Sequence, residues 1–176
     1  KFNVPMICVG KLSLGGTGKS PMVEHLLSLL DGQYQLATLS RGYKRKTKGY
    51  ALANDKSTAL EIGDEPMQFF IKFPTVAIAV GEKRVEAIPL LLQDRQETDV
   101  VILDDAFQHR AVKAGFNIIL TEFSNLYTRD FYLPTGDLRD QTASASRADL
   151  IVVTKSPVHL ESNLAASIID ELKPLP

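Results

Sequence analysis

The sequence predicts an α/β fold with a doubly wound, mostly parallel sheet. Three observations predict it: short apolar runs alternate with helical patterns, most of these runs are continuously apolar, and a glycine-rich motif joins the first run to the first helical pattern. Continuously apolar runs are typical of strands that are covered on both faces. A strand–helix–strand rhythm produces a parallel sheet, which binds ligands at the carboxyl ends of its strands.

The elements of the first half follow from local patterns. Residues 4–9 form the first apolar run. The helix expected at 17–30 has one apolar face, formed by Met22, Val23, Leu26, Leu27 and Leu30. Residues 35–39 form the second strand, and basic and turn-forming residues at 41–53 then predict a small β excursion from the sheet. A helix at 65–72 and a strand at 75–80 follow.

The second half repeats the rhythm. A helical pattern at 83–96 leads to apolar runs at 99–103 and 117–120, and a turn-rich segment at 133–140 precedes the last strand, 150–153, and a helix at 160–172. A length of 176 residues fits one domain of ordinary size, so all of the chain, 1–176, is expected to form one domain.

Composition excludes several classes of protein. The chain has 176 residues, 44% of them hydrophobic and 23% charged, which is typical of a soluble globular domain. A net charge of −1 predicts no nucleic-acid partner. Cys8 lies inside the first apolar run and reads as a small buried hydrophobe in a reducing compartment. No apolar run reaches the ~18 residues of a membrane span, and no signal peptide is visible. Because the chain starts at Lys1 without Met, we expect it to be a piece of a longer protein.

The glycine-rich motif at 13–20 has the strand–loop–helix setting of a phosphate-binding loop, which indicates a P-loop NTPase type of sheet. Its glycines let successive backbone N–H groups point at phosphate oxygens, at the positive end of the following helix. Lys19 can reach the outer phosphates, and the Ser20 hydroxyl can ligate Mg²⁺. The alternative is a glycine-rich turn that binds no nucleotide. The candidate nucleotide-binding residues are Ser13, Gly15, Gly16, Thr17, Gly18, Lys19 and Ser20.

Asp104 and Asp105 follow the apolar run 99–103 and are expected at the carboxyl edge of the sheet. Like charges ~4 Å apart repel by about 4 kcal/mol at an effective dielectric of 20, and a divalent cation between them removes this repulsion. We therefore favour a metal site here, with either aspartate possible, over a simple helix cap. His109, one turn further on, could contact phosphate or position a neighbouring carboxylate, and the alternative is a structural histidine.

Asp64 precedes Glu65-Pro66, a sequence that starts helices. The functional alternative is a general base that accepts the proton of an attacking hydroxyl, a task that kinases commonly give to an aspartate. Spacing alone does not decide between the two.

Two further segments follow predicted strands. Arg41 could bind a phosphate and Tyr43 could stack on a ligand. The basic residues Lys44, Arg45, Lys46 and Lys48 come next, and such a run is either a solvated loop or a contact to anionic headgroups. Arg139 beside Asp140 is either a surface ion pair or an anion clamp. At the end of the last strand, Thr154 and Pro157 occupy the two positions that a guanine-reading Asn-Lys-x-Asp motif requires for its asparagine and aspartate.

Together these segments resemble the tetraacyldisaccharide 4′-kinase family of lipid A biosynthesis. The matching motifs occur in family order at residues 9–21, 40–43, 63–66, 104–109, 138–140 and 154–155. A hydroxyl residue at position 13 is itself usual in that family. Three positions differ from the common family pattern: Lys44 and Ala106 stand where glycine is frequent, and Asp140 stands where glutamate is usual.

The resemblance implies ATP-dependent, Mg²⁺-assisted phosphorylation of the 4′-hydroxyl of a tetraacyl glucosamine disaccharide 1-phosphate, giving lipid IVA. It implies that Asp64 is the base, and that Lys19, Asp104, Asp105 and His109 surround the phosphates, with Ser20, Asp104 and Asp105 at the metal. Substrate contacts would come from Arg41, Tyr43, Arg84, Arg139 and Asp140. The partners implied are the lipid substrate and the membrane surface, at the cytoplasmic face of the bacterial inner membrane, with no specific protein partner. Family members also carry an N-terminal membrane helix and a C-terminal lobe, which this chain is expected to lack.

Two other functions remain possible from the residues alone. A nucleotide switch, such as a GTPase of the metallocentre-assembly type, shares the Gly-Gly-x-Gly-Lys loop, but the guanine motif is missing here. The chain could also be a nucleotide-binding module without catalysis.

Overall fold

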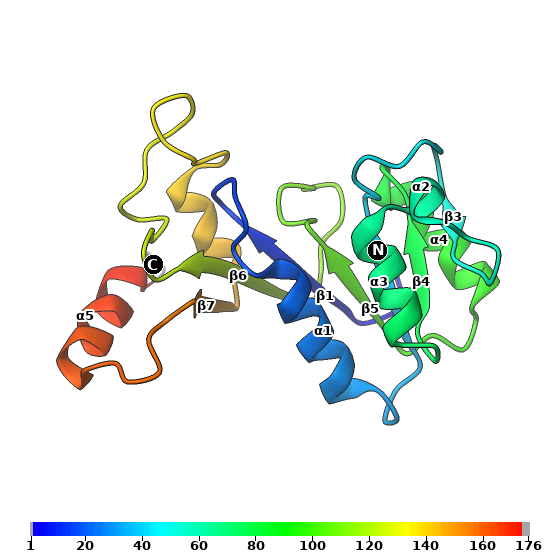
Figure 1. The fold of residues 1–176 in the computed structure, drawn as a ribbon, viewed down its shortest axis with the longest axis horizontal. Helices are drawn as coiled ribbons and strands as arrows, with labels where there is room; N and C mark the ends of the chain where they lie inside the picture. Colours follow the sequence, from blue (N-terminus) through cyan, green and yellow to red (C-terminus); the bar gives the residue numbers. More distant parts are fainter. Residues whose placement is uncertain (1, 174–176) are drawn as a thin grey trace.

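The computed structural model describes residues 2–173 as one sheet with helices on both faces (Figure 1). Seven strands lie in the order β3-β4-β2-β5-β1-β6-β7. They are β1 (Met6–Lys11), β2 (Leu36–Ser40), β3 (Ala51–Leu52), β4 (Ala77–Val80), β5 (Val100–Asp104), β6 (Phe116–Glu122) and β7 (Leu150–Thr154). All neighbours pair in parallel except β3, which runs antiparallel to β4. The doubly wound sheet and the β excursion within 41–53 are confirmed.

The predicted helices form close to their expected ranges. They are α1 (Lys19–Leu30), α3 (Asp64–Lys72), α4 (Arg84–Asp94) and α5 (Ser162–Leu172). The structure adds α2 (Ala59–Ile62) and a 3₁₀ helix, η1 (Thr142–Arg147), which sequence analysis missed. Helix α2 is too short for apolar periodicity, although its capping box between Thr58 and Glu61 is readable in the sequence.

Two apolar layers hold the helices on the sheet. Helices α1 and α3 bury Leu27 and Phe69 against one face, and α4 and α5 bury Leu91 and Ile168 against the other. Each such side chain contributes about 1.5–3 kcal/mol when it is fully buried. Cys8 lies in the second layer, where burial raises the pKa of its thiol to about 12 and keeps it protonated. This confirms its expected role as a buried apolar residue. Within residues 2–173, no helix has the length and apolar composition that crossing a bilayer demands.

Gly10 in β1 offers a test of this packing. A Cβ atom at Gly10 would lie 2.3 Å from Cβ of Phe107, which is closer than real carbon atoms approach. We expect G10A to lower the free energy of unfolding by about 1–3 kcal/mol, as overpacked cores do. Urea denaturation of G10A and of a control, G115A, measures this, because a Cβ at Gly115 has its nearest neighbour at 3.7 Å. Equal stability of the two variants would contradict the packing described.

Candidate active site

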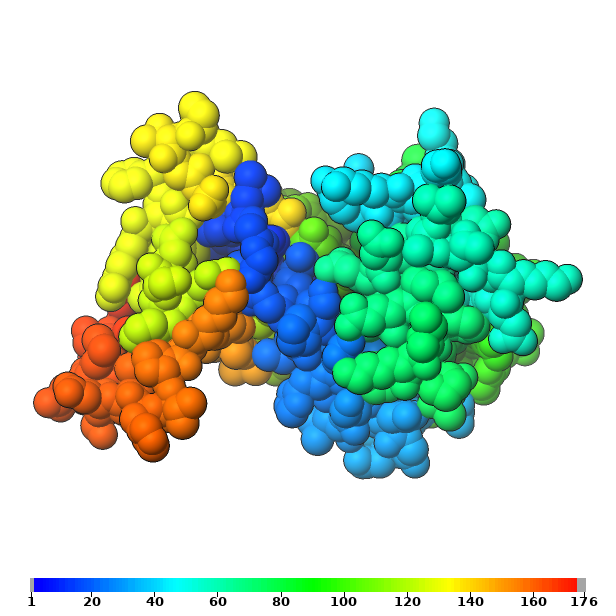
Figure 2. Space-filling model, in the orientation of Figure 1, coloured from blue at the N-terminus to red at the C-terminus, as the bar shows by residue number. Residues whose placement is uncertain are grey.

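The carboxyl ends of the neighbouring strands β2, β5 and β1 meet at one edge of the sheet, where a cleft of about 630 Å³ opens. In Figure 2 the dark blue loop after β1 stands between the cyan segment after β2 and the yellow segment after β6. The cleft is lined by Lys11, Leu14, Gly15, Lys19, Ser40, Arg41, Gly42, Tyr43, Lys44, Asp64, Glu65, Pro66, Asp104, Asp105 and Arg139. Segments far apart in the sequence thus supply both acidic and basic side chains to one cavity.

The loop between β1 and α1 has the backbone that its sequence requires. Gly15 and Gly18 have φ values of 91° and 82°, in the left-handed region that glycine adopts without strain. The loop is tied to the rest of the sheet edge at both ends. Leu14 N donates to the Asp137 carbonyl over 2.7 Å, and Thr154 Oγ1 lies 3.0 Å from the Thr17 carbonyl, to which it donates. Lys19, the first residue of α1, lines the cleft.

The start of α3 brings two acidic side chains to the cleft. Asp64 is the first residue of the helix, so the helix-start interpretation is confirmed. Its side chain is also exposed and lines the cleft, so the same residue is available to a substrate. Its neighbour Glu65, which sequence analysis did not single out, accepts a hydrogen bond of 2.5 Å from Ser20 Oγ. The residue predicted to ligate Mg²⁺ therefore already contacts a carboxylate.

Asp104 ends β5 as a buried carboxylate, with 3% of its surface exposed. Among the described residues, its Oδ1 atom has no hydrogen-bond partner. Burial raises the pKa of this carboxyl to about 6, and the charge of Lys19 opposes that rise. A buried oxygen that lacks a partner carries a free-energy cost, which a bound cation can remove.

Asp105 has a different environment from its neighbour. It adopts a left-handed backbone (φ 49°), which aspartate tolerates better than most residues do. Arg139 forms an ion pair with its carboxylate. Burial acts to raise the pKa of Asp105, but the hydrogen bond from Arg139 and the charge of Lys19 hold it below its usual value. Arg139 thus pairs with Asp105 across the cleft rather than with the adjacent Asp140.

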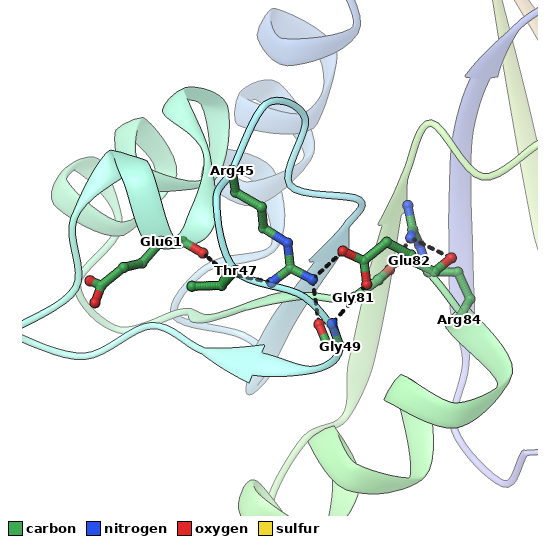
Figure 3. Close-up of polar contacts among 7 residues, drawn as sticks. All are labelled: Arg45, Thr47, Gly49, Glu61, Gly81, Glu82 and Arg84. Atoms are coloured by element: carbon green, nitrogen blue, oxygen red, sulfur yellow. Dashed lines mark hydrogen bonds and ion pairs between the residues drawn. The ribbon is translucent and has the colours of Figure 1, made fainter.

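Arg84, which the family resemblance places along the active-site cleft, is not among the residues that line it. It is 2% exposed, and its guanidinium donates to the carbonyl of Gly81 (Figure 3). It also donates to the carbonyl of Asp104 over 3.2 Å. Burial lowers the pKa of Arg84, although Asp104 opposes this. The side chain thus joins the segment that follows β4 to the last residue of β5.

The basic run after Tyr43 divides into internal and exposed members. The Arg45 side chain is 2% exposed and forms an ion pair of 2.7 Å with Glu82, whose other oxygen accepts from Gly49 N over 3.0 Å (Figure 3). Arg45 therefore stabilises its own loop, and its side chain is buried, unlike the side chains of a basic run that is solvated along its whole length. Lys44, Lys46 and Lys48 are exposed. The braced loop presents Tyr43, 73% exposed, to the cleft.

Asp140 and His109 also lie outside the cleft lining, as do the expected loop residues Ser13, Gly16, Thr17, Gly18 and Ser20. Asp140 accepts hydrogen bonds from Gln141 N and Ser144 Oγ, at 2.8 and 3.0 Å, so its carboxylate holds the start of η1. His109 has a buried Nδ1 atom without a partner among residues 2–173. The geometry therefore indicates a structural role for Asp140, and the structure does not bring His109 onto the wall shared by Asp104 and Lys19.

Sequence analysis did not name Lys11 and Glu65 as site residues, and it expected Ser40 at the ligand edge only as part of the segment 40–43. Lys11 and Ser40 are the last residues of β1 and β2, so the rule that ligands bind at carboxyl ends of parallel strands was the available signal. The described residues contain no cluster of three or more His, Cys, Asp or Glu side chains that could hold a metal ion. A cation here therefore requires the Ser20 hydroxyl or oxygens of a ligand in addition to the carboxylates.

Comparisons with known proteins agree with this geometry. The family model of LpxK, tetraacyldisaccharide-1-P 4′-kinase, matches residues 1–173. A tetraacyldisaccharide 4′-kinase of Flavobacterium johnsoniae is 51% identical over 98% of this chain and 51% of its own length. One of Bacteroides thetaiotaomicron is 51% identical over 89% of this chain and 41% of its own length. The chain thus spans about half the length of the curated relatives it matches.

A solved structure shares the fold. It is a crystal structure of LpxK from Aquifex aeolicus, described as an "apo" form in complex with ATP, with a TM-score of 0.81 and 36% identity over 92% of this chain and 52% of the other. The family model covers nearly the whole chain, which confirms the resemblance that the sequence motifs indicated. The chain belongs to the tetraacyldisaccharide 4′-kinase family.

Proposed function

We propose that the whole protein transfers the γ-phosphoryl group of ATP to the 4′-hydroxyl of a tetraacyl glucosamine disaccharide 1-phosphate, giving lipid IVA in lipid A biosynthesis. The observation that carries the proposal is the single cleft in which Lys19, Asp64 and Asp104 meet. Family membership supplies the substrate class.

The nucleotide is assigned to the loop after β1. The LpxK relative from Aquifex aeolicus is described in complex with ATP, and its fold matches 92% of this chain. Backbone N–H groups of a glycine loop and the start of α1 provide donors and positive potential for phosphates. The proposed nucleotide-binding residues are Ser13, Gly15, Gly16, Thr17, Gly18, Lys19 and Ser20.

The side chains fit Mg²⁺, which prefers oxygen ligands and retains waters and phosphate oxygens. Asp104 has a buried oxygen without a partner among the described residues, and it lines the same cleft as Glu65, whose carboxylate accepts a hydrogen bond from Ser20. We assign the metal to Asp104 and Ser20, with Glu65 beside them, since Asp105 is neutralised by Arg139. A bound Mg²⁺ supplies positive charge to the transferring phosphoryl group.

The residues of the chain then share three tasks. Lys19 and the loop amides hold the phosphates and neutralise charge, Asp64 accepts the proton of the attacking hydroxyl, and the loop braced by Arg45 presents Arg41 and Tyr43 to the sugar phosphate. Correct positioning of the reactants can supply up to ~7–11 kcal/mol of the lowering of the barrier. His109 does not line the cleft, so we assign it no contact to substrate.

The same arrangement supports a membrane-surface location, at the cytoplasmic face of the inner membrane. Lys44, Lys46 and Lys48 are exposed on the loop that borders the cleft. Each lysine near an anionic lipid surface contributes about 1 kcal/mol of binding.

The decisive experiment incubates the full-length protein with ATP labelled in the γ-phosphate and the disaccharide 1-phosphate lipid. Label should move to the lipid, and excess unlabelled ATP should compete better than GTP. Preference for GTP without labelled lipid would favour a nucleotide switch. Binding of ATP without transfer by the full-length protein would favour a non-catalytic module.

A further inference from the structure

Lys11 ends β1 directly beneath the phosphate loop and is 5% exposed. Its backbone is fixed from two sides. It aligns with Leu120 in the parallel pairing of β1 and β6, and Gln108 Nε2 donates to its carbonyl over 2.6 Å. Its ammonium donates to the carbonyl of Gly15. This hydrogen bond therefore joins residue 11, at the end of β1, to residue 15 within the loop.

This placement leaves donor capacity unused. An ammonium has three N–H donors and no acceptor. Among residues 2–173, one hydrogen bond from Lys11 Nζ is found, the one to Gly15. Lys11 lines the same cleft as Lys19, and Cβ atoms placed on Gly15 or Gly16 would meet nothing within 4 Å, so the adjacent loop borders open space.

The charges around Lys11 favour an anion. Burial lowers the pKa of Lys11 to about 8, Lys19 and Arg139 lower it as well, and Asp105 and Glu65 act in the opposite direction. Because Asp105 already pairs with Arg139, its negative charge is shared. A buried cation among other cations costs free energy that a polyphosphate in the cleft recovers.

We propose that Lys11 is a second phosphate-binding lysine of this site, which holds the loop through the Gly15 carbonyl and donates its remaining N–H groups to the phosphate tail of a bound nucleotide. The inference rests on the proposed nucleotide site and goes beyond it, because the loop motif gives this task to Lys19 alone. Because the backbone of Lys11 belongs to a central strand of the sheet, it is positioned more rigidly than the backbone of a lysine on a loop.

Binding of ATP, ADP and AMP to the full-length protein, measured by titration calorimetry, tests the proposal. K11M should weaken ATP binding by about 10- to 100-fold, the loss expected when a charged hydrogen bond is removed. The loss should shrink from ATP to ADP to AMP, and K11R should restore most of it. K11Q should show the same graded loss, because its amide can still hold Gly15 but has no charge. K56M, an exposed lysine outside the cleft, is the control.

The outcomes separate this proposal from the proposed function. Wild-type ATP binding together with unchanged binding by K11M and K11Q overturns only the role of Lys11. Equal losses for all three nucleotides, or losses that follow a drop in melting temperature, mean that Lys11 shapes the loop without contacting phosphate. If the wild-type protein binds none of the nucleotides, the proposed function fails and this inference falls with it.

Discussion

Replacing Asp64 with Asn in the full-length protein should lower kcat by about 10²- to 10⁴-fold, the contribution of a positioned general base. Asp64 begins α3 and presents an exposed carboxylate to the cleft that Lys19 and Asp104 also line. An amide keeps the shape of the side chain but cannot accept the proton of the attacking hydroxyl. The dissociation constant for ATP should stay nearly unchanged, since the loop and Lys19 hold the nucleotide. Steady-state kinetics and ATP titration measure the two effects separately.

The same variant distinguishes the base from a helix start. A negative charge in the first turn stabilises a helix by about 0.3–1 kcal/mol, so D64N should lower the melting temperature slightly in either case. If transfer to the lipid continues at the normal rate, Asp64 only begins α3 and another group accepts the proton. D55N, at an exposed aspartate outside the cleft, should change neither the rate of transfer to the lipid nor the melting temperature.

Replacing Asp104 with Asn should have opposite effects on activity and stability. Loss of a proposed metal ligand should reduce Mg²⁺-dependent turnover by at least about 100-fold, since even outer partners of metal sites contribute factors of 10–100. Burial of Asp104 raises its pKa from 3.8 to about 6, so its negative charge is costly in the folded protein without metal. With EDTA present at pH 7.5, D104N should therefore be more stable than the wild type, by up to about 3 kcal/mol.

The sign of the pH dependence follows from linkage. Between pH 4 and 6 the unfolded chain has lost the proton of Asp104 while the folded chain retains it, so the folded state loses stability as pH rises through this window. D104N removes that loss. Urea denaturation at a series of pH values should show equal stability of variant and wild type near pH 4 and a gap that opens toward pH 6.

Asp105 is the matched control for the stability of D104N, because its surroundings shift its pKa in the opposite direction from that of Asp104. Its pKa is depressed by the hydrogen bond from Arg139, despite burial that acts to raise it, so its ionised form stabilises the fold above its unfolded pKa. D105N should therefore be less stable than the wild type at pH 7.5. Destabilisation of the same size in D104N and D105N would contradict the assignment of separate roles to the two aspartates.

Much of the architecture was predictable from local patterns. Continuous apolar runs predicted the six longer strands, since a strand covered on both faces must be apolar throughout. The glycine spacing at 15, 16 and 18 predicted the loop, because positive φ values are accessible to glycine. Helix α2 and the 3₁₀ helix η1 were not predicted, because one or two turns contain too few residues to show a helical period.

The roles of individual charged residues were less predictable, because they depend on partners that are distant in the sequence. Arg45 lies in a basic run that resembles a solvated loop, yet its side chain is buried and forms an ion pair with Glu82, 37 residues away. Arg84 is the first residue of α4, yet it is buried and donates to the carbonyls of Gly81, which follows β4, and of Asp104, at the end of β5.

The sequence by itself determined the sheet, the phosphate-binding loop and the family, because each depends on short-range patterns or on motifs kept in order. Only the tertiary structure decided how the charges are shared: Asp105 is neutralised by Arg139, Asp104 is left buried with a free oxygen, and Lys11 lies beside Lys19 in one cleft. Strand order and burial set these pairings, and neither is encoded in the spacing of residues along the chain.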